Sequence, residues 1–186
     1  MAAKCRTTDR RLRKYDYMGA QITAQQKKSI LEVMTMANLI EIAGLRQACE
    51  DYQLAGREIL DRFTLEEIAA EYNGAGPDSW LPIAREALTA VMELFKPVVL
   101  IHDMQFAQSD GTDEGFAKTV DDWCGNTRKI LAAAYPFWTW RLLNKSYRIK
   151  LAYWTGIMET VNIAISTPAA KDAWIAAYQK RSNNHA

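Results

Sequence analysis

Apolar side chains recur at helical spacing along most of this chain. Between Thr23 and Phe63 no proline interrupts the sequence, and apolar residues return every three or four positions. This pattern predicts two successive helices, or one helix that bends near Gly44. The first part of the segment is apolar on nearly all sides, which predicts a central, buried helix.

Helix start and stop signals divide the next part of the chain. Thr64 followed by Glu67 forms a capping box, so we expect a short helix over residues 65–72. The string NGAGPDSWLP at residues 73–82 contains two glycines and two prolines and is the strongest break in the chain. The short helix should therefore end there.

Two longer helices are predicted after this break. Pro82 suits the first turn of a helix that should run to the loop SDGTD at residues 109–113, with a kink at Pro97. From Glu114 the apolar positions follow the i, i+4, i+7, i+11, i+14 rule of an amphipathic helix, which should return antiparallel to the one before it. These positions are Phe116, Val120, Trp123, Thr127 and Ile130.

The last third of the chain carries large apolar side chains on a three-four spacing. They predict one long helix over residues 137–165, whose stripe is interrupted only by Asn144. The stripe is expected to pack as core or to form the seam of a homodimer. Thr167-Pro168 should cap a final helix that ends near Arg181. The stripe consists of Phe137, Trp140, Tyr147, Leu151, Trp154, Met158, Val161 and Ile165.

These elements predict an all-α fold, a single-domain bundle of about six to eight helices with a long, aromatic-rich C-terminal helix. No segment shows sustained alternation with a period of two residues, so no substantial sheet is expected. The chain has 186 residues, 49% of them hydrophobic, which suffices for a core without disulfides or metals. We expect a basic flexible arm at residues 1–20, a helical domain at 21–181 and a polar tail at 182–186.

The charge of the chain leaves only local patches as binding sites for anionic partners. The formal net charge is +1, so the field of the whole molecule is weak. The N-terminal arm holds six Lys and Arg residues; it is either a solvated tail or an arm that binds nucleic acid or another anionic partner.

The cysteines and the apolar runs indicate the cellular compartment in which the protein is expected. Three cysteines without a CxxC arrangement argue against a disulfide framework and against a zinc site. No signal peptide and no transmembrane segment is expected, because no apolar run is long enough. A cytoplasmic protein is the expectation, in the host cytoplasm if the chain is phage-encoded.

Aromatic and basic residues alternate near the start of the C-terminal stripe. This mixture allows a lipid-interface surface or a surface on which single-stranded nucleic acid stacks. The basic residues lie mostly off the three-four register, so a core stripe with a solvated basic face explains the same pattern. The residues concerned are Trp138, Trp140, Tyr147 and Trp154, with Arg141, Lys145, Arg148 and Lys150 between them.

Candidate chemistry is concentrated at His102 and Asp103. The other histidine, His185, lies in the polar tail, so His102 is the one candidate for an ordered imidazole base. Metal-dependent HD phosphohydrolases and HExxH zinc enzymes both need more histidines, and neither site can be built here. The motifs GxxxxGK[ST], strand-linked GxGxxG and GxSxG are absent, which excludes the nucleotide-binding and α/β-hydrolase classes that depend on them.

The spacing of the candidate residues assigns them different tasks. Neighbours on a helix point about 100° apart, so His102 and Asp103 can address two parts of one site, one as base and the other as ligand. A carboxylate of the following helix, Asp122 or Asp121, could orient the imidazole. Asp122 is the better candidate because it shares a flank of that helix with Asn126.

The string Asn73-Gly74-Ala75-Gly76-Pro77 followed by His102-Asp103 resembles two groups of proteins. One is the phospholipase A2 superfamily, which carries a His-Asp pair on a helix; the other consists of small phage and prophage proteins with an NGxGP…HD pattern. The resemblance covers roughly residues 72–130. It implies that His102 activates water and that Asp122 orients His102. It also implies that Asp103 binds calcium together with the loop of Asn73, Gly74 and Gly76, for calcium-dependent hydrolysis of phospholipid.

Two alternatives to this chemistry stay open. In the first, His102 is a partly buried histidine that is hydrogen-bonded to Asp122 or to a backbone carbonyl, and residues 73–77 only end a helix. In the second, the chain is a non-catalytic phage accessory protein that binds a host or viral protein or nucleic acid.

Overall fold

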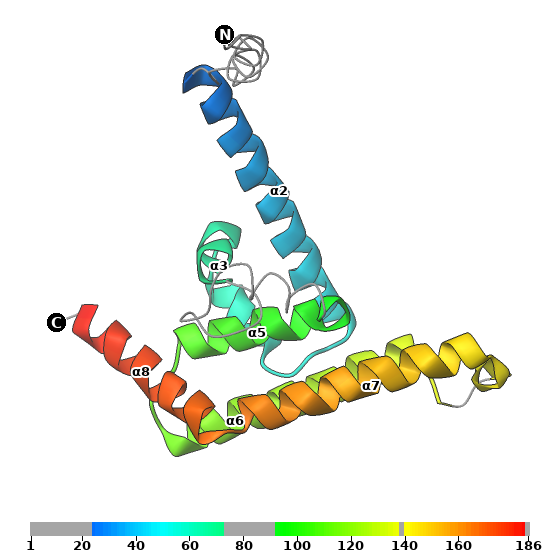
Figure 1. Cartoon of the computed structure of the whole chain (residues 1–186). Coiled ribbons are helices and arrows are strands. Elements are labelled where there is room, and N and C mark those ends of the chain that lie inside the picture. Colours follow the sequence, from blue (N-terminus) through cyan, green and yellow to red (C-terminus); the bar gives the residue numbers. More distant parts are fainter. Residues whose placement is uncertain (1–23, 73–91, 138–139, 185–186) are drawn as a thin grey trace, which may run out of the picture. The chain divides into compact units, whose positions relative to one another are not determined.

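The all-α prediction is confirmed throughout the part of the chain that the structure describes. The structure is a computed structural model that describes residues 24–72, 92–137 and 140–184, with backbone alone for 24–31, Met34 and Asn184. Every element in these ranges is a helix (Figure 1). The chain divides into two compact units, Met1–Ala37 and Asn38–Ala186, and the predicted arm at residues 1–20 lies outside the described residues.

Helix α2 (Ala24–Asp51) is a single α-helix that runs through Gly44. The prediction that its first part is buried on nearly all sides is wrong, because Val33, Met36 and Ile40 are each about two-thirds exposed. Within the second unit, Ile42 and Cys49 lie two turns apart on one line and are completely buried. Only that line of the helix reaches the core, so the apolar residues on its other faces stay in contact with solvent.

The segment after α2 follows its local sequence signals. A turn with positive φ at Gln53 and Gly56 leads into the 3-10 helix η2 (Arg57–Arg62). Helix α3 (Leu65–Glu71) then begins with the predicted capping box. The Thr64 hydroxyl accepts from the Glu67 N–H, and the Glu67 carboxylate accepts from the Thr64 N–H.

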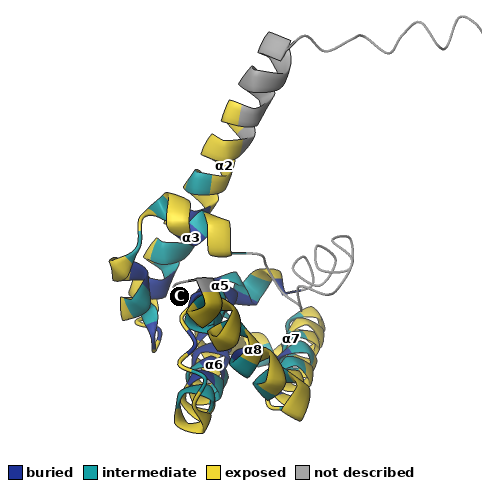
Figure 2. Ribbon diagram, turned by 90° about the vertical axis from the view of Figure 1, so that its left-hand side faces the viewer, coloured by how far each residue is buried: buried dark blue, intermediate teal, exposed yellow. Residues whose placement is uncertain are grey.

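Helix α5 (Lys96–Ala107) forms the centre of the core. Its residues 97–101 are all buried, and Figure 2 shows dark-blue, buried segments along it. Pro97 lies in its first turn, after the short 3-10 helix η3 (Glu93–Phe95), so the predicted kink at Pro97 is wrong. Proline fits the first turn because the N–H that it lacks has no partner within the helix there.

Helices α6 (Asp113–Ala134) and α7 (Lys145–Ile165) pack side by side (Figure 1). The predicted single helix over residues 137–165 is wrong in its first part. The 3-10 helix η4 (Trp140–Leu143) comes first, and Asn144, the polar residue in the stripe, caps α7 with its side chain. Helix α8 (Pro168–Asn184) follows and extends past Arg181 into the predicted polar tail.

The apolar stripe of α7 divides into two parts. From Leu151 onward it packs against the core, where the ring of Trp154 lies edge-on to Phe95 with centroids 5.8 Å apart and Met158 is buried. Between the two alternatives for this part of the stripe, core packing is the one observed. The stripe before Leu151 lies largely outside the core.

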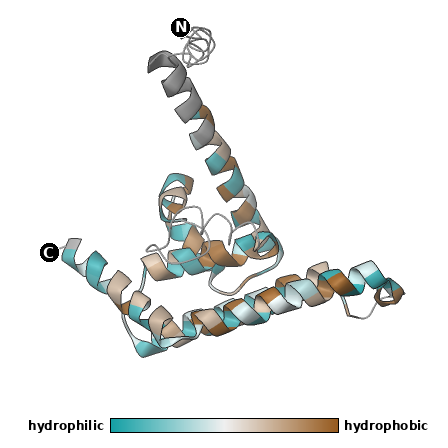
Figure 3. Cartoon of the chain, viewed as in Figure 1, coloured by the Kyte–Doolittle hydropathy of each residue, from teal (hydrophilic) through white to brown (hydrophobic). Residues whose placement is uncertain are grey.

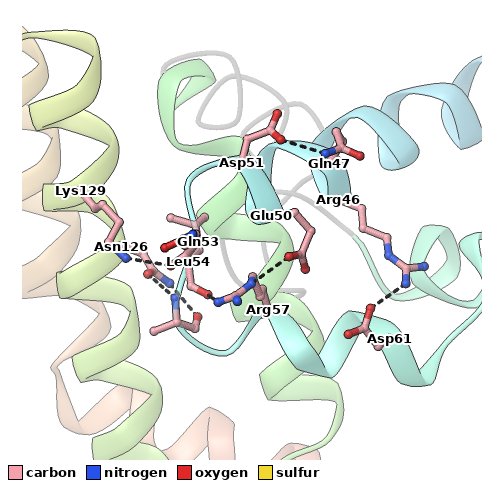
Figure 4. A network of polar contacts seen from close by, with 11 residues as sticks. Arg46, Gln47, Glu50, Asp51, Gln53, Leu54, Arg57, Asp61, Asn126 and Lys129 are labelled. Carbon is pink, nitrogen blue, oxygen red and sulfur yellow. Dashed lines mark hydrogen bonds and ion pairs between the residues drawn. The ribbon is translucent and has the colours of Figure 1, made fainter.

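The side chain of Asn126 ties α6 to the turn before η2 (Figure 4). Its carbonyl oxygen accepts from the N–H of Ala55 at 2.8 Å, and its amide nitrogen donates to the carbonyl of the same residue at 2.9 Å. Lys129, one turn further along α6, donates to the carbonyl of Gln53 at 2.8 Å. Arg57 links the same turn back to Glu50 of α2.

No helix among the described residues is both long and apolar enough to cross a membrane.

We predict that Asn126→Ala lowers the free energy of unfolding by about 1–2 kcal/mol, because a buried amide loses two hydrogen bonds to one backbone unit. Urea denaturation measures the change. The neighbouring Gly125 is exposed, and a Cβ added there would meet nothing within 4 Å. Gly125→Ala is therefore the control and should raise stability by about 0.5–1 kcal/mol. A loss below about 0.5 kcal/mol in Asn126→Ala would show that this tie is dispensable.

Candidate functional site

His102 lies on α5 between two aromatic rings. Its imidazole is tilted against the ring of Phe106, with centroids 4.4 Å apart, and meets the edge of the Trp123 indole of α6 at 4.9 Å. The side chain is 19% exposed, so one side of the imidazole still reaches solvent. Packing against the rings of Phe106 and Trp123 holds the imidazole in one orientation.

Asp103 lies close to Tyr72, at the point where the chain leaves α3. Its carboxylate is 3.8 Å from Nδ1 of His102, which is longer than a hydrogen bond and fits two neighbours that point apart on a helix. Burial raises the pKa of Tyr72 well above its usual range, and the carboxylate of Asp103 adds to the effect, followed by those of Glu41 and Glu93. The Tyr72 hydroxyl is buried without a hydrogen-bond partner among the described residues. It therefore keeps its proton at neutral pH beside these carboxylates.

Asp122 forms its hydrogen bonds away from His102. Its Oδ2 atom accepts from Nε2 of Gln105 at 2.8 Å and from Nζ of Lys118 at 2.7 Å. Gly56 packs against this group so closely that a Cβ added there would lie 2.6 Å from Nε2 of Gln105. The structure thus assigns Asp122 to a tie between α5 and α6, and the predicted orienting role toward His102 has no counterpart in these contacts.

The predicted calcium ligands are only partly within the described residues. Asp103 is described, whereas Asn73, Gly74 and Gly76 lie outside them. Within residues 24–72, 92–137 and 140–184, no group of three or more His, Cys, Asp or Glu side chains is arranged to hold a metal ion. The calcium site stays a prediction that rests on one placed carboxylate.

The two described cysteines are unsuited to act as nucleophiles. Burial raises the pKa of Cys49 to about 12, and its thiol donates to the carbonyl of Pro97 at 3.2 Å. Burial also raises the pKa of Cys124. Because the thiolate is the reactive form, both side chains are unreactive thiols at neutral pH.

A hollow of about 310 Å³ opens beside the Gln105–Asp122 tie. Trp174 of α8 forms an apolar part of its lining, and the charged residues around it carry both signs, among them Glu58, Arg62, Asp110 and Lys118. Mixed charge of this kind favours no particular class of ligand.

A second candidate site lies where α6 and α7 are joined, and we call its described residues, 135–137 and 140–153, the basic tip. Five large apolar side chains are exposed there, with Trp140 at 78% and Leu143 at 88%. Figure 3 shows hydrophobic segments at this end of the α6–α7 pair, next to hydrophilic ones. The five are Phe137, Trp140, Leu143, Ile149 and Tyr153.

The basic tip lies in a stretch of the sequence whose charged residues all have one sign. No Asp or Glu occurs between Asp122 and Glu159, whereas six Lys and Arg residues do. All six are exposed, and four of them belong to the basic tip. The six are Arg128, Lys129, Arg141, Lys145, Arg148 and Lys150.

Polar and aromatic contacts fix the backbone of the basic tip. The rings of Tyr135 and Tyr147 lie 5.5 Å apart, and the Tyr147 hydroxyl donates to the carbonyl of Pro136 at 3.1 Å. The side-chain oxygen of Asn144 accepts from the N–H groups of Ser146 and Tyr147, which starts α7 at a defined residue. The apolar side chains are thus exposed on an ordered scaffold; Trp138, which the sequence pattern included, lies outside the described residues.

Sequence reasoning found this segment only as an alternative to core packing. The signal that favoured exposure was present in the 36 residues 123–158, which contain no acidic residue. A solvated helix face usually mixes both signs of charge.

Comparison of the chain with protein-family models, with curated proteins and with solved structures found no match.

Proposed function

We propose that this protein is a binding protein that holds an anionic partner through the basic tip. The observation that carries the proposal is the gathering of exposed apolar and basic side chains at one end of the α6–α7 pair, without acidic residues. Elsewhere in the second unit, the large apolar residues of α5 are buried in the core. The non-catalytic accessory protein, which the sequence left open as an alternative to hydrolysis, is therefore the function that the geometry supports best.

The exposure of the apolar side chains argues for a partner. Burial of a leucine side chain stabilises a protein by about 1.5–3 kcal/mol. Leu143 is 88% exposed in the free chain, so it contributes almost none of this free energy of burial. Single exposed apolar residues are common on monomers, but gathered ones with a polar rim mark an interaction site. The ordered backbone also lowers the cost of binding, because fewer side chains and loops need to be fixed.

The charge of the basic tip argues for the sign of that partner. The net charge of the chain is small, so attraction must come from local charge, and screening limits that attraction to about 8–10 Å at physiological salt. The basic tip carries Lys145, Arg148 and Lys150 as exposed cations, and its own segment of the sequence, residues 123–158, contains no acidic residue.

An electrostatic link favours a second candidate function, phospholipid hydrolysis at His102. The carboxylate of Asp103 raises the pKa of Tyr72, and Tyr72 directly precedes Asn73, the first residue of the loop predicted to bind calcium with Asp103. In this proposal His102 takes a proton from water as the water oxygen attacks the ester carbonyl. The ester C–O bond then breaks, and the proton passes to the departing alcohol oxygen. Bound calcium would polarise the carbonyl.

Reversing charge at the basic tip should weaken binding to a polyanion. We expect the full-length Arg148→Glu/Lys150→Glu variant to bind heparin at least roughly tenfold more weakly than the wild type, because two attractive charges become repulsive. The variant should also elute from heparin at lower salt. The control Arg62→Glu/Lys180→Glu makes the same change in charge on η2 and α8 and should elute close to the wild type. Equal shifts in both variants would show that net charge alone matters and would contradict the proposed site.

Hydrolysis is tested with dispersed phospholipid in the presence of calcium, with release of fatty acid as the readout. If His102 is the general base, His102→Asn should lower the rate by about 10²–10⁴-fold, since asparagine cannot take the proton. His185→Asn removes the other histidine and should have no effect. A parent protein that releases no fatty acid, or an unchanged rate in His102→Asn, would exclude this second function.

A further inference from the structure

We infer that the partner of the basic tip is the surface of an anionic lipid bilayer. The inference rests on the proposed function, because it names the partner of that same site. It follows from three properties of the described side chains: the presence of aliphatic as well as aromatic groups, their position on common helix faces, and the basic residues that flank them.

Aliphatic side chains distinguish a bilayer from single-stranded nucleic acid. Leu143 is the most exposed large apolar residue of the basic tip, and Ile149 is 58% exposed. A base stacks on a flat aromatic or guanidinium face, which neither residue offers. Acyl chains pack against any apolar side chain, so a bilayer can bury Leu143 and Ile149 as well as Trp140.

The apolar side chains share helix faces that a flat surface can meet. Trp140 and Leu143 are three residues apart in η4, and in a 3-10 helix residues at that spacing lie one above the other. Ile149 and Tyr153 are four residues apart in α7 and share a face there. Trp140 and Tyr153 also have amphipathic rings, which are enriched at the level of lipid headgroups.

Basic residues flank these apolar faces. Lys145 and Arg148 precede Ile149 within one turn of α7, and Lys150 follows it directly. Each Lys or Arg held near a surface of phosphatidylserine or phosphatidylinositol strengthens binding by about fivefold at physiological salt. Amphipathic helices lie in a membrane interface by inserting apolar side chains among the headgroups while their basic side chains contact the lipid phosphates.

Sedimentation of the full-length protein with vesicles tests the inference. The protein should bind vesicles of phosphatidylglycerol and phosphatidylcholine in equal parts, and bind vesicles of phosphatidylcholine alone far more weakly. The Leu143→Ser/Ile149→Ser variant keeps every charge and should bind the anionic vesicles at least about tenfold more weakly, because the apolar contribution is lost. Its retention on heparin should not change.

The matched control is Ile40→Ser/Ile163→Ser. Both residues are about as exposed as Ile149, at 68% and 70%, but lie outside the basic tip. This control should bind like the wild type, and thermal melting shows whether each variant is folded. Equal binding by the two double variants and the wild type would overturn the inference.

The two proposals fail in different ways. A wild-type protein that binds heparin or a single-stranded oligonucleotide through Arg148 and Lys150, but does not bind anionic vesicles, would overturn the bilayer as partner and leave the anionic-partner function in place. A protein that binds neither heparin nor vesicles would overturn both.

Discussion

The two hydrogen bonds between the Asn126 side chain and the backbone of Ala55 are the interaction on which the second unit depends. They join the middle of α6 to the turn between α2 and η2, residues 71 positions apart in the chain. One turn earlier on the same helix, the indole N–H of Trp123 donates to the buried side-chain oxygen of Asn162 of α7. Polar contacts thus tie α6 both to the turn before η2 and to α7, and each buried amide has to be in register for the other to form.

Both candidate sites follow from this placement of α6. Trp123 forms one wall of the surroundings of His102, and Asp122, its neighbour in sequence, bonds to Gln105 of α5. Further along, α6 ends at Ala134, past the last core residue of that helix, Leu131. The position of the end of α6 past the core explains why Phe137, Trp140 and Leu143, which follow it, are exposed.

Local signals predicted the parts of the fold that depend on neighbouring residues. The capping box at Thr64 and the start of the final helix after Thr167 each involve groups within a few positions, and both are observed. Periodicity was less informative, because it shows which residues share a face but not what covers that face. Val33 and Ile40 of α2, together with Phe137 and Trp140, illustrate this, as they have the spacing of a core stripe and remain exposed.

Polar partners across the fold were the hardest to predict. Asp122 was expected to bond to His102, but Gln105 is one turn further along α5, and its amide meets the carboxylate instead. Asn144 disturbed the three-four pattern because it caps a helix there, and Pro97 starts a helix because its missing N–H needs no partner in the first turn. A single sequence does not specify which of several polar side chains meet, since each has many acceptable partners.

The functional interpretation depends most on the claim that an anionic lipid bilayer covers the exposed apolar side chains of the basic tip. Fluorine NMR of protein labelled with 5-fluorotryptophan tests it directly, with signals assigned by single Trp→Phe substitutions. In the free protein a soluble paramagnetic agent should broaden the signal of Trp140, which is 78% exposed, and spare that of Trp123, which is 4% exposed. With anionic bicelles present, the Trp140 signal should become protected. A Trp140 signal that the agent broadens equally with and without anionic bicelles would contradict the account.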